Sequence, residues 1–233
     1  MSGMTTRERI LGALRAAAPV PTPDSRELEA RINRHHSHGV LRAASPKQRA
    51  DEMERVMTSV RTEVLRSDAA SWPALLADKL AQAGVQRILL DAATAEGAAL
   101  NAALPAAVKT LPFSKPLEAW KDSLFSTVDA GFTVARSGIA ATGTLVLAPD
   151  AGTPRTVSLV PPVHVALVYA STLHADLHAV MHAERWGAGM PTNLVLVSGP
   201  SKTSDIQQTL AYGAHGPRAL WVVIVDDVVE DQA

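Results

Sequence analysis

The stretch NLVLVSGPSKTSDIQQTLAYGAHGPRALWVVIVDD, residues 193–227, decides the fold class. Its first apolar run ends at Ser198, and Ser204 followed by Gln207 three residues later forms the capping-box pattern that begins a helix. Gly213 is a typical helix stop, and a second apolar run comes after it. The stretch therefore predicts a strand, a loop, a helix and a strand, which is the alternation of an α/β sheet.

The same alternation occurs upstream. Ser71-Trp72-Pro73 begins a predicted helix that Gly84 ends, and the apolar run 85–91 predicts a buried strand. A helix over 94–104, a short strand over 108–111 and a helix over 116–124 follow. We expect an α/β fold, a mixed sheet flanked by helices, that is largely parallel in its first half.

The middle of the chain has a different pattern. Four strand-like runs follow one another with no room for crossover helices, which predicts an antiparallel insert; they span 126–138, 142–150, 154–160 and 163–170. Residues 171–186 then predict a helix with Ser171 as its N-cap, before the strand near 193–198.

The N-terminal part predicts a helical arm. A helix over 6–17 ends at a proline-rich linker, and a short helix over 25–32 follows. Ser45 and Pro46 are a typical N-cap and first helical residue, here of a long helix expected to reach about Arg66. We assign residues 1–45 to the arm and its linker, and residues 46–233 to a single α/β domain.

Composition excludes several classes of function. The 22 Lys and Arg nearly balance the 23 Asp and Glu, so no overall field favours nucleic acid or an anionic membrane. The 233 residues contain no cysteine, which excludes disulfides, a thiol nucleophile and thiolate ligands for zinc or an iron–sulfur cluster. No secretory signal and no segment of membrane-spanning length is apparent, so we expect a cytoplasmic protein.

Two loops are candidates for ligand binding. The start of the predicted helix after Lys202 would present free backbone N–H groups to a carboxylate or phosphate, although an ordinary capped helix fits the pattern equally. The spacing of GPSKTS is not that of a Walker loop. In the turn Thr142-Gly143-Thr144, a glycine beside two hydroxyls would let a ligand approach the backbone, and a simple hairpin is the alternative.

Five of the eight histidines lie in patterns that could carry chemistry. Pro161 and Pro162 interrupt a strand, which could aim His164 out of the sheet, although a half-buried histidine is the commoner case. His215 lies in a tight turn before the last strand. Three histidines spaced by four residues, at 174, 178 and 182, cannot all reach one ion from a helix, so we predict no metal site.

Three motifs together carry a family resemblance: GIAATGTLVL, SLVPPVHVALV and VSGPSKTSDIQQTLAYGAHGPRALWVVIVDD, in this order. The chain resembles the lactate-utilisation protein C family, also called the LUD domain, most strongly over 126–226. The resemblance implies a fold related to the NagB, ribose-5-phosphate isomerase and CoA-transferase group. It also implies two partner subunits, at least one of them with iron–sulfur clusters, that oxidise L-lactate to pyruvate.

The family's motif loops give the expected ligand-binding residues, which are Thr142, Gly143, Thr144, Pro162, His164, Ser198, Gly199, Pro200, Ser201, Lys202, Thr203, Asp205, His215 and Gly216. Ala141 occupies the place where the family usually has a glutamate, so a carboxylate that could act as base or nucleophile is absent. Binding of a small anionic ligand is therefore expected before catalysis.

The resemblance favours an accessory subunit that binds no cofactor itself and works with iron–sulfur partners. Two alternatives remain open at this point. One is a stand-alone enzyme acting on a phosphorylated or CoA-linked small molecule, suggested by the sheet and the predicted helix start. The other is an interaction module that docks through its charged helical arm.

Overall fold

The computed structural model describes residues 5–17, 24–37, 39–204 and 210–228, and the chain divides into two compact units, Met1–His38 and Gly39–Ala233. The first unit contains the two predicted helices, α1 (Thr6–Ala16) and α2 (Ser25–His36). Thr5 and Glu8 form a capping box at the start of α1, and neither helix buries a residue. The second helix runs four residues beyond the predicted Ile32, to His36.

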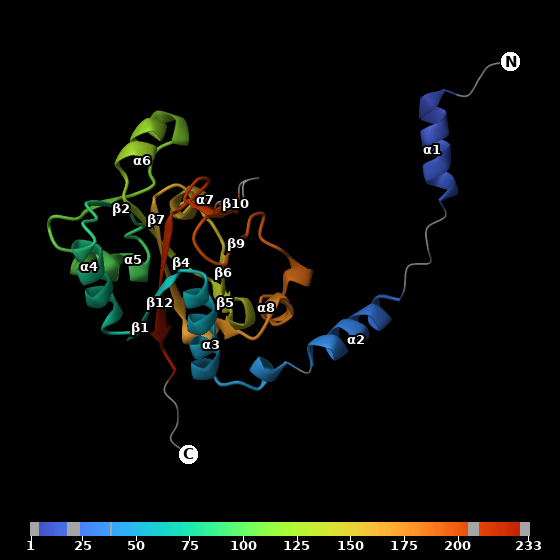
Figure 1. Cartoon of the computed structure of the whole chain (residues 1–233), viewed down its shortest axis with the longest axis horizontal. Coiled ribbons are helices and arrows are strands. Elements are labelled where there is room, and N and C mark those ends of the chain that lie inside the picture. Colours follow the sequence, from blue (N-terminus) through green and yellow to red (C-terminus); the bar gives the residue numbers. More distant parts are fainter. Residues whose placement is uncertain (1–4, 18–23, 38, 205–209, 229–233) are drawn as a thin grey trace. The chain divides into compact units, whose positions relative to one another are not determined.

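The second unit is built on a six-stranded sheet in which every pair is parallel (Figure 1). The strands lie in the order β1 (Glu63–Asp68), β12 (Ala219–Asp226), β7 (Val163–Tyr169), β4 (Ala130–Val134), β2 (Arg87–Leu89) and β3 (Lys109–Leu111). The predicted α/β fold, with a sheet flanked by helices, is confirmed.

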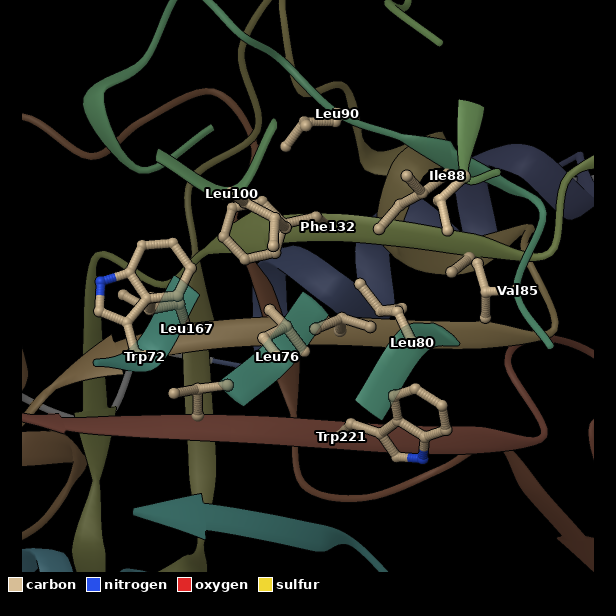
Figure 2. Close-up of a cluster of buried hydrophobic side chains, with 14 of the residues drawn as sticks. Trp72, Leu76, Leu80, Val85, Ile88, Leu90, Leu100, Phe132, Leu167 and Trp221 are labelled. Atoms are coloured by element: carbon tan, nitrogen blue, oxygen red, sulfur yellow. The ribbon is translucent and has the colours of Figure 1, made fainter. Parts of the chain in front are cut away.

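Strand β12 shows why the sheet is covered on both faces. Its side chains alternate, and both sets are buried. Trp221 and Val223 pack with α4 (Trp72–Gln82) and α5 (Ala95–Ala103), in the cluster drawn in Figure 2. Val222 and Ile224 pack with α3 (Pro46–Ser59) on the other face. A strand that is apolar on both faces belongs in the middle of a parallel sheet.

A smaller sheet covers the α3 side, with strand order β8 (Leu173–His174), β5 (Ser137–Ile139), β6 (Thr144–Leu147) and β9 (Val195–Val197). Leu145 and Leu173 from this sheet join Met53 and Met57 of α3 in one buried cluster. The remaining helices are α6 (Lys121–Thr127), α7 (Arg155–Leu159), α8 (Leu177–Ala183) and the short 3-10 turns at 40–42, 117–119, 140–142, 170–172 and 186–188. No helix among the described residues is both long and apolar enough to cross a membrane.

The predicted antiparallel insert is only partly correct. The hairpin of β5 and β6 is antiparallel, but β4 and β7 pair in parallel within the main sheet. Residues 154–160, predicted as a strand, contain helix α7 instead. Pro154 precedes this helix with a φ already suited to its start, and Val157 is buried against Leu89 and Leu124. The short helix therefore lies within the connection between the parallel neighbours β4 and β7, after the hairpin of β5 and β6.

Three further predicted helices have different bounds. The helix expected over 116–124 is a 3-10 turn at 117–119 followed by α6, which runs from Lys121 to Thr127. The helix begun by Ser45 ends at Ser59, not near Arg66, because the Thr62 N–H bonds back to the Met57 carbonyl and the chain then enters β1. The predicted N-cap Ser171 is also wrong. Asp176 caps α8 by accepting from the Ala179 N–H, and residues 173–174 form β8.

Candidate ligand-binding site

A pocket of about 200 Å³ lies at the amino ends of β7 and β12. His164 and Leu220, each the second residue of its strand, form part of its wall, together with Ser158 and Leu159 of α7. The remaining walls come from residues 195–201 and from the turn 215–217. Seven of the fourteen predicted residues, far apart in sequence, thus meet around one cavity: His164, Ser198, Gly199, Pro200, Ser201, His215 and Gly216.

His164 and Ser158 are the buried polar residues among the described lining of this pocket, and His164 is the one that can titrate. It is 1% exposed, and its Nε2 lies 2.8 Å from Thr133 Oγ1 on the neighbouring strand β4. Burial lowers its pKa to about 4, so the imidazole is neutral at pH 7. Within the described residues Nδ1 makes no hydrogen bond. A neutral ring nitrogen can donate or accept one hydrogen bond, but it contributes no charge to the pocket.

The turn Thr142-Gly143-Thr144 does not line this pocket, although it contacts the loop 198–201 that does. Thr144 Oγ1 lies 2.7 Å from Thr142 Oγ1 and 2.8 Å from Ser198 Oγ, so the turn is hydrogen-bonded to the loop. A Cβ on Gly143 would lie 3.0 Å from side-chain carbons of Val56 and Met57. The glycine thus allows close packing against α3.

Pro162 has a structural position at the pocket's edge. Its carbonyl accepts the N–H groups of Arg218 and Ala219, which places the turn 215–217 and the start of β12 beside β7. The missing N–H of proline is consistent with its place at the beginning of a central strand. Ala141, the residue before the turn 142–144, is exposed and donates its N–H to the Ala175 carbonyl.

The helix predicted to begin at Ser204 is not present where the structure describes the chain. Lys202–Ser204 forms β10 and Leu210–Tyr212 forms β11, and the two strands pair antiparallel. The Gly213 N–H bonds to the Ser201 carbonyl, which closes the base of this hairpin. Residues 205–209, including the predicted site residue Asp205, lie outside the described residues. The anion-binding helix start expected after Lys202 is therefore replaced by a strand that contains Thr203.

A second depression of about 440 Å³ lies on the other side of the loop 198–200. It shares Ser198, Gly199 and Pro200 with the pocket of His164 and is lined in addition by Arg61, Lys202 and Tyr212. The Arg61 guanidinium carbon lies 4.8 Å from the centre of the Tyr212 ring. Sequence reasoning missed Arg61 because the helix predicted to reach Arg66 placed it in a helix interior, and missed Tyr212 because it was assigned to a helix.

The three spaced histidines do not share a helix. His174 lies in β8, and burial is the main cause that lowers its pKa. His178 and His182 lie one turn apart on α8 with their Nε2 atoms 2.9 Å apart. Within the ranges that the structure describes, no three His, Cys, Asp or Glu side chains are arranged to hold a metal ion.

Comparison with known proteins identifies the family. The family model "LUD domain" matches residues 50–225. The chain belongs to the LUD domain family. An uncharacterized protein of Neisseria meningitidis serogroup B is 38% identical over 95% of this chain and 94% of its own length. "Lactate utilization protein C" of Exiguobacterium sp. is 27% identical over 81% of this chain and 83% of its own.

A solved structure supports the fold of this LUD domain. The crystal structure of a DUF162 family protein from Deinococcus radiodurans aligns with a TM-score of 0.59 and covers 78% of this chain and 99% of that protein. The sequence identity is 21%, so the likeness concerns the fold alone. The family resemblance predicted from the three motifs is confirmed by the family model and the relatives.

Proposed function

We propose that this LUD domain protein takes part in lactate utilisation, as a cytoplasmic accessory subunit that binds a small anionic ligand beside iron–sulfur partners. The observation that carries the proposal is the pocket in which His164, the loop 198–201 and the turn 215–217 meet, all of them within the residues that the LUD domain model matches. The name of the Exiguobacterium relative, Lactate utilization protein C, supports the pathway.

The chemistry of the pocket favours binding over catalysis. None of its lining residues is an aspartate or glutamate, and Ala141 supplies no carboxylate. His164 is a weak base, because burial holds its pKa near 4. Hydroxyls at 158, 198 and 201 and the imidazole of His164 can orient a ligand through hydrogen bonds.

Electron transfer is assigned to partners in this proposal. A chain without cysteine has no thiolates with which to ligate an iron–sulfur cluster. The oxidation of lactate would then occur on other subunits, and this chain would hold a ligand that controls or completes their assembly. The proposed partners are therefore the iron–sulfur subunits of the same system.

Gene deletion with growth on lactate tests the proposal. We expect the deletion strain to grow normally on glucose and to lose growth on lactate. The wild-type gene should restore it, and a Ser201→Val variant, which loses a hydroxyl at the pocket, should restore it poorly. A Ser126→Val variant is the matched control, because this exposed hydroxyl lies on α6 away from the pocket. Unchanged growth of the deletion strain on lactate would refute the lactate role.

Affinity purification of the tagged protein from lactate-grown cells tests the partners. The eluate should contain iron and acid-labile sulfide, and it should reduce a dye when lactate is added. An iron-free and inactive eluate, obtained under conditions that preserve the clusters, would contradict the accessory-subunit proposal.

The alternative of a stand-alone enzyme for a phosphorylated or CoA-linked molecule rested partly on the helix start expected after Lys202, where the structure has strand β10. One observation still favours a phosphate-bearing ligand, namely the cationic depression beside Arg61.

A further inference from the structure

Arg61 occupies a backbone conformation that usually selects glycine. It follows the end of α3 with φ of 66°, and among the described residues the only other non-glycine residue with positive φ is Arg185. Its N–H bonds to the Thr58 carbonyl, and the next N–H, of Thr62, bonds to the Met57 carbonyl, which is the usual pattern of a glycine-terminated helix. A side chain that is kept at such a position carries a conformational cost.

The side chain of Arg61 lines the same depression as a second cation, Lys202. Its guanidinium stacks over Tyr212, and Tyr212 is directly opposite Lys202 in the β10–β11 pair. Residues directly opposite in an antiparallel pair project from the same face, so Lys202 and Arg61 both border the ring of Tyr212. All three residues line the depression of about 440 Å³.

The two cations lack acidic neighbours in the described structure. None of the residues lining the depression is an aspartate or glutamate, and no ion pair to Arg61 or Lys202 occurs among the described residues. Attraction between a helix C-terminus and a cation would account for a basic residue at position 61, directly after α3. It does not account for the lysine, or for the use of arginine where glycine would cost less.

We propose that this depression binds the phosphate group of a small phosphorylated molecule, with Arg61 and Lys202 as its two charged contacts. A phosphate monoester carries nearly two negative charges at pH 7 and can accept two parallel N–H bonds from a guanidinium, whereas a monocarboxylate would balance one of the two cations. The inference rests on the proposed function, because it names the class of anionic ligand for a subsite that shares the loop 198–200 with the pocket of His164. The loop 198–200 separates this subsite from the pocket of His164.

Calorimetric titration of the full chain with inorganic phosphate tests this inference, with lactate titrated in parallel. We expect saturable phosphate binding that Arg61→Gly weakens at least tenfold and Lys202→Gln weakens by a similar factor. Arg61→Gly is informative because glycine relieves the backbone strain, so the thermal midpoint should not fall. Lys109→Gln removes the same charge from an exposed position on β3 and should leave binding unchanged.

Each result decides the proposal. Absence of phosphate binding, or an equal loss of affinity in Lys109→Gln, would overturn it. Tighter binding of lactate than of phosphate, with the same dependence on Arg61, would replace the phosphate by a monocarboxylate as the ligand class. Growth on lactate is a separate readout. Phosphate binding in a protein whose deletion does not impair that growth would support the subsite and refute the lactate role.

Discussion

His164 Nε2 of strand β7 lies 2.8 Å from Thr133 Oγ1 of the adjacent strand β4, and both side chains are buried. The two residues are diagonal neighbours, since His164 is directly opposite Gly131 and Thr133 is directly opposite Ala166. The hydroxyl fixes the orientation of the ring at the wall of the pocket. A neutral, oriented imidazole is therefore part of the folded structure.

Stability should depend on pH through His164. Its pKa is about 4 in the folded chain against an ordinary value of 6.5, so the unfolded chain binds the proton more tightly. The stabilisation is complete above pH 6.5 and is lost as the pH falls towards 4, by about 3 kcal/mol in total. Urea unfolding at several pH values measures this loss.

The control for this prediction is His164→Gln, which removes the titrating group and keeps a polar side chain. The free energy of unfolding of the variant should decline less steeply between pH 6.5 and 4 than that of the wild-type protein. His174, whose pKa is also lowered, contributes to both proteins equally. Identical slopes would contradict the lowered pKa of His164 in the folded chain.

Removing the Thr144 hydroxyl should loosen the loop that borders both cavities. Thr144 is 5% exposed and is bonded to Thr142 and Ser198, so Thr144→Val leaves the Ser198 hydroxyl without this partner. We expect a loss of about 1–2 kcal/mol in the free energy of unfolding. Thr142 is the exposed end of this row of three hydroxyls, so Thr142→Val should lower the free energy of unfolding by less than about 0.5 kcal/mol. Equal losses in the two variants would contradict the proposed anchoring of the loop.

Much of the fold could be predicted where apolar runs were long and bounded by clear caps. The run 219–226 is apolar on both faces, and the helix over 72–82 begins at Trp72-Pro73 and ends before Gly84, so both appear as expected. Strand β1 was missed because it continues a charged helix in sequence with only two apolar residues, Val64 and Leu65. Its pairing with β12, a tertiary contact, outweighs local propensity.

Seven of the fourteen predicted site residues line the pocket of His164, but the local structure of the loop that follows them was not predictable. The pattern of Ser204 and Gln207 is that of a capping box, yet Lys202–Ser204 pairs with Leu210–Tyr212 as a hairpin. Short strands of three residues have little periodicity of their own. Arg61 joins the site only because α3 ends at Ser59 and the chain turns back into β1, which no local pattern indicated.

The protonated nitrogens of two histidines on α8 should differ. Arg42 Nη2 lies 2.7 Å from His178 Nδ1, and arginine can only donate, so His178 Nδ1 accepts. The proton of neutral His178 is then on Nε2 and is donated to His182 Nε2, 2.9 Å away, which places the His182 proton on Nδ1. Long-range ¹H–¹⁵N correlation spectra at alkaline pH measure both tautomers. Arg42→Met should allow His178 to populate both forms, and a proton on Nδ1 of His178 in the wild-type protein would contradict the arrangement.

The role of Gly143 can be separated into backbone strain and crowding by comparison with Gly84. Both glycines have positive φ, 57° and 72°, so alanine at either position should cost about 1–2 kcal/mol. A Cβ on Gly84 meets nothing within 4 Å, whereas on Gly143 it would lie 3.0 Å from Met57, which is fully buried.

Gly143→Ala should therefore destabilise the protein more than Gly84→Ala, by a further ~1 kcal/mol or more, as measured by urea unfolding. The added loss would show that the glycine serves the packing of the turn against α3, and through Thr144 the position of Ser198. Equal losses would mean that Met57 and Val56 move aside at little cost.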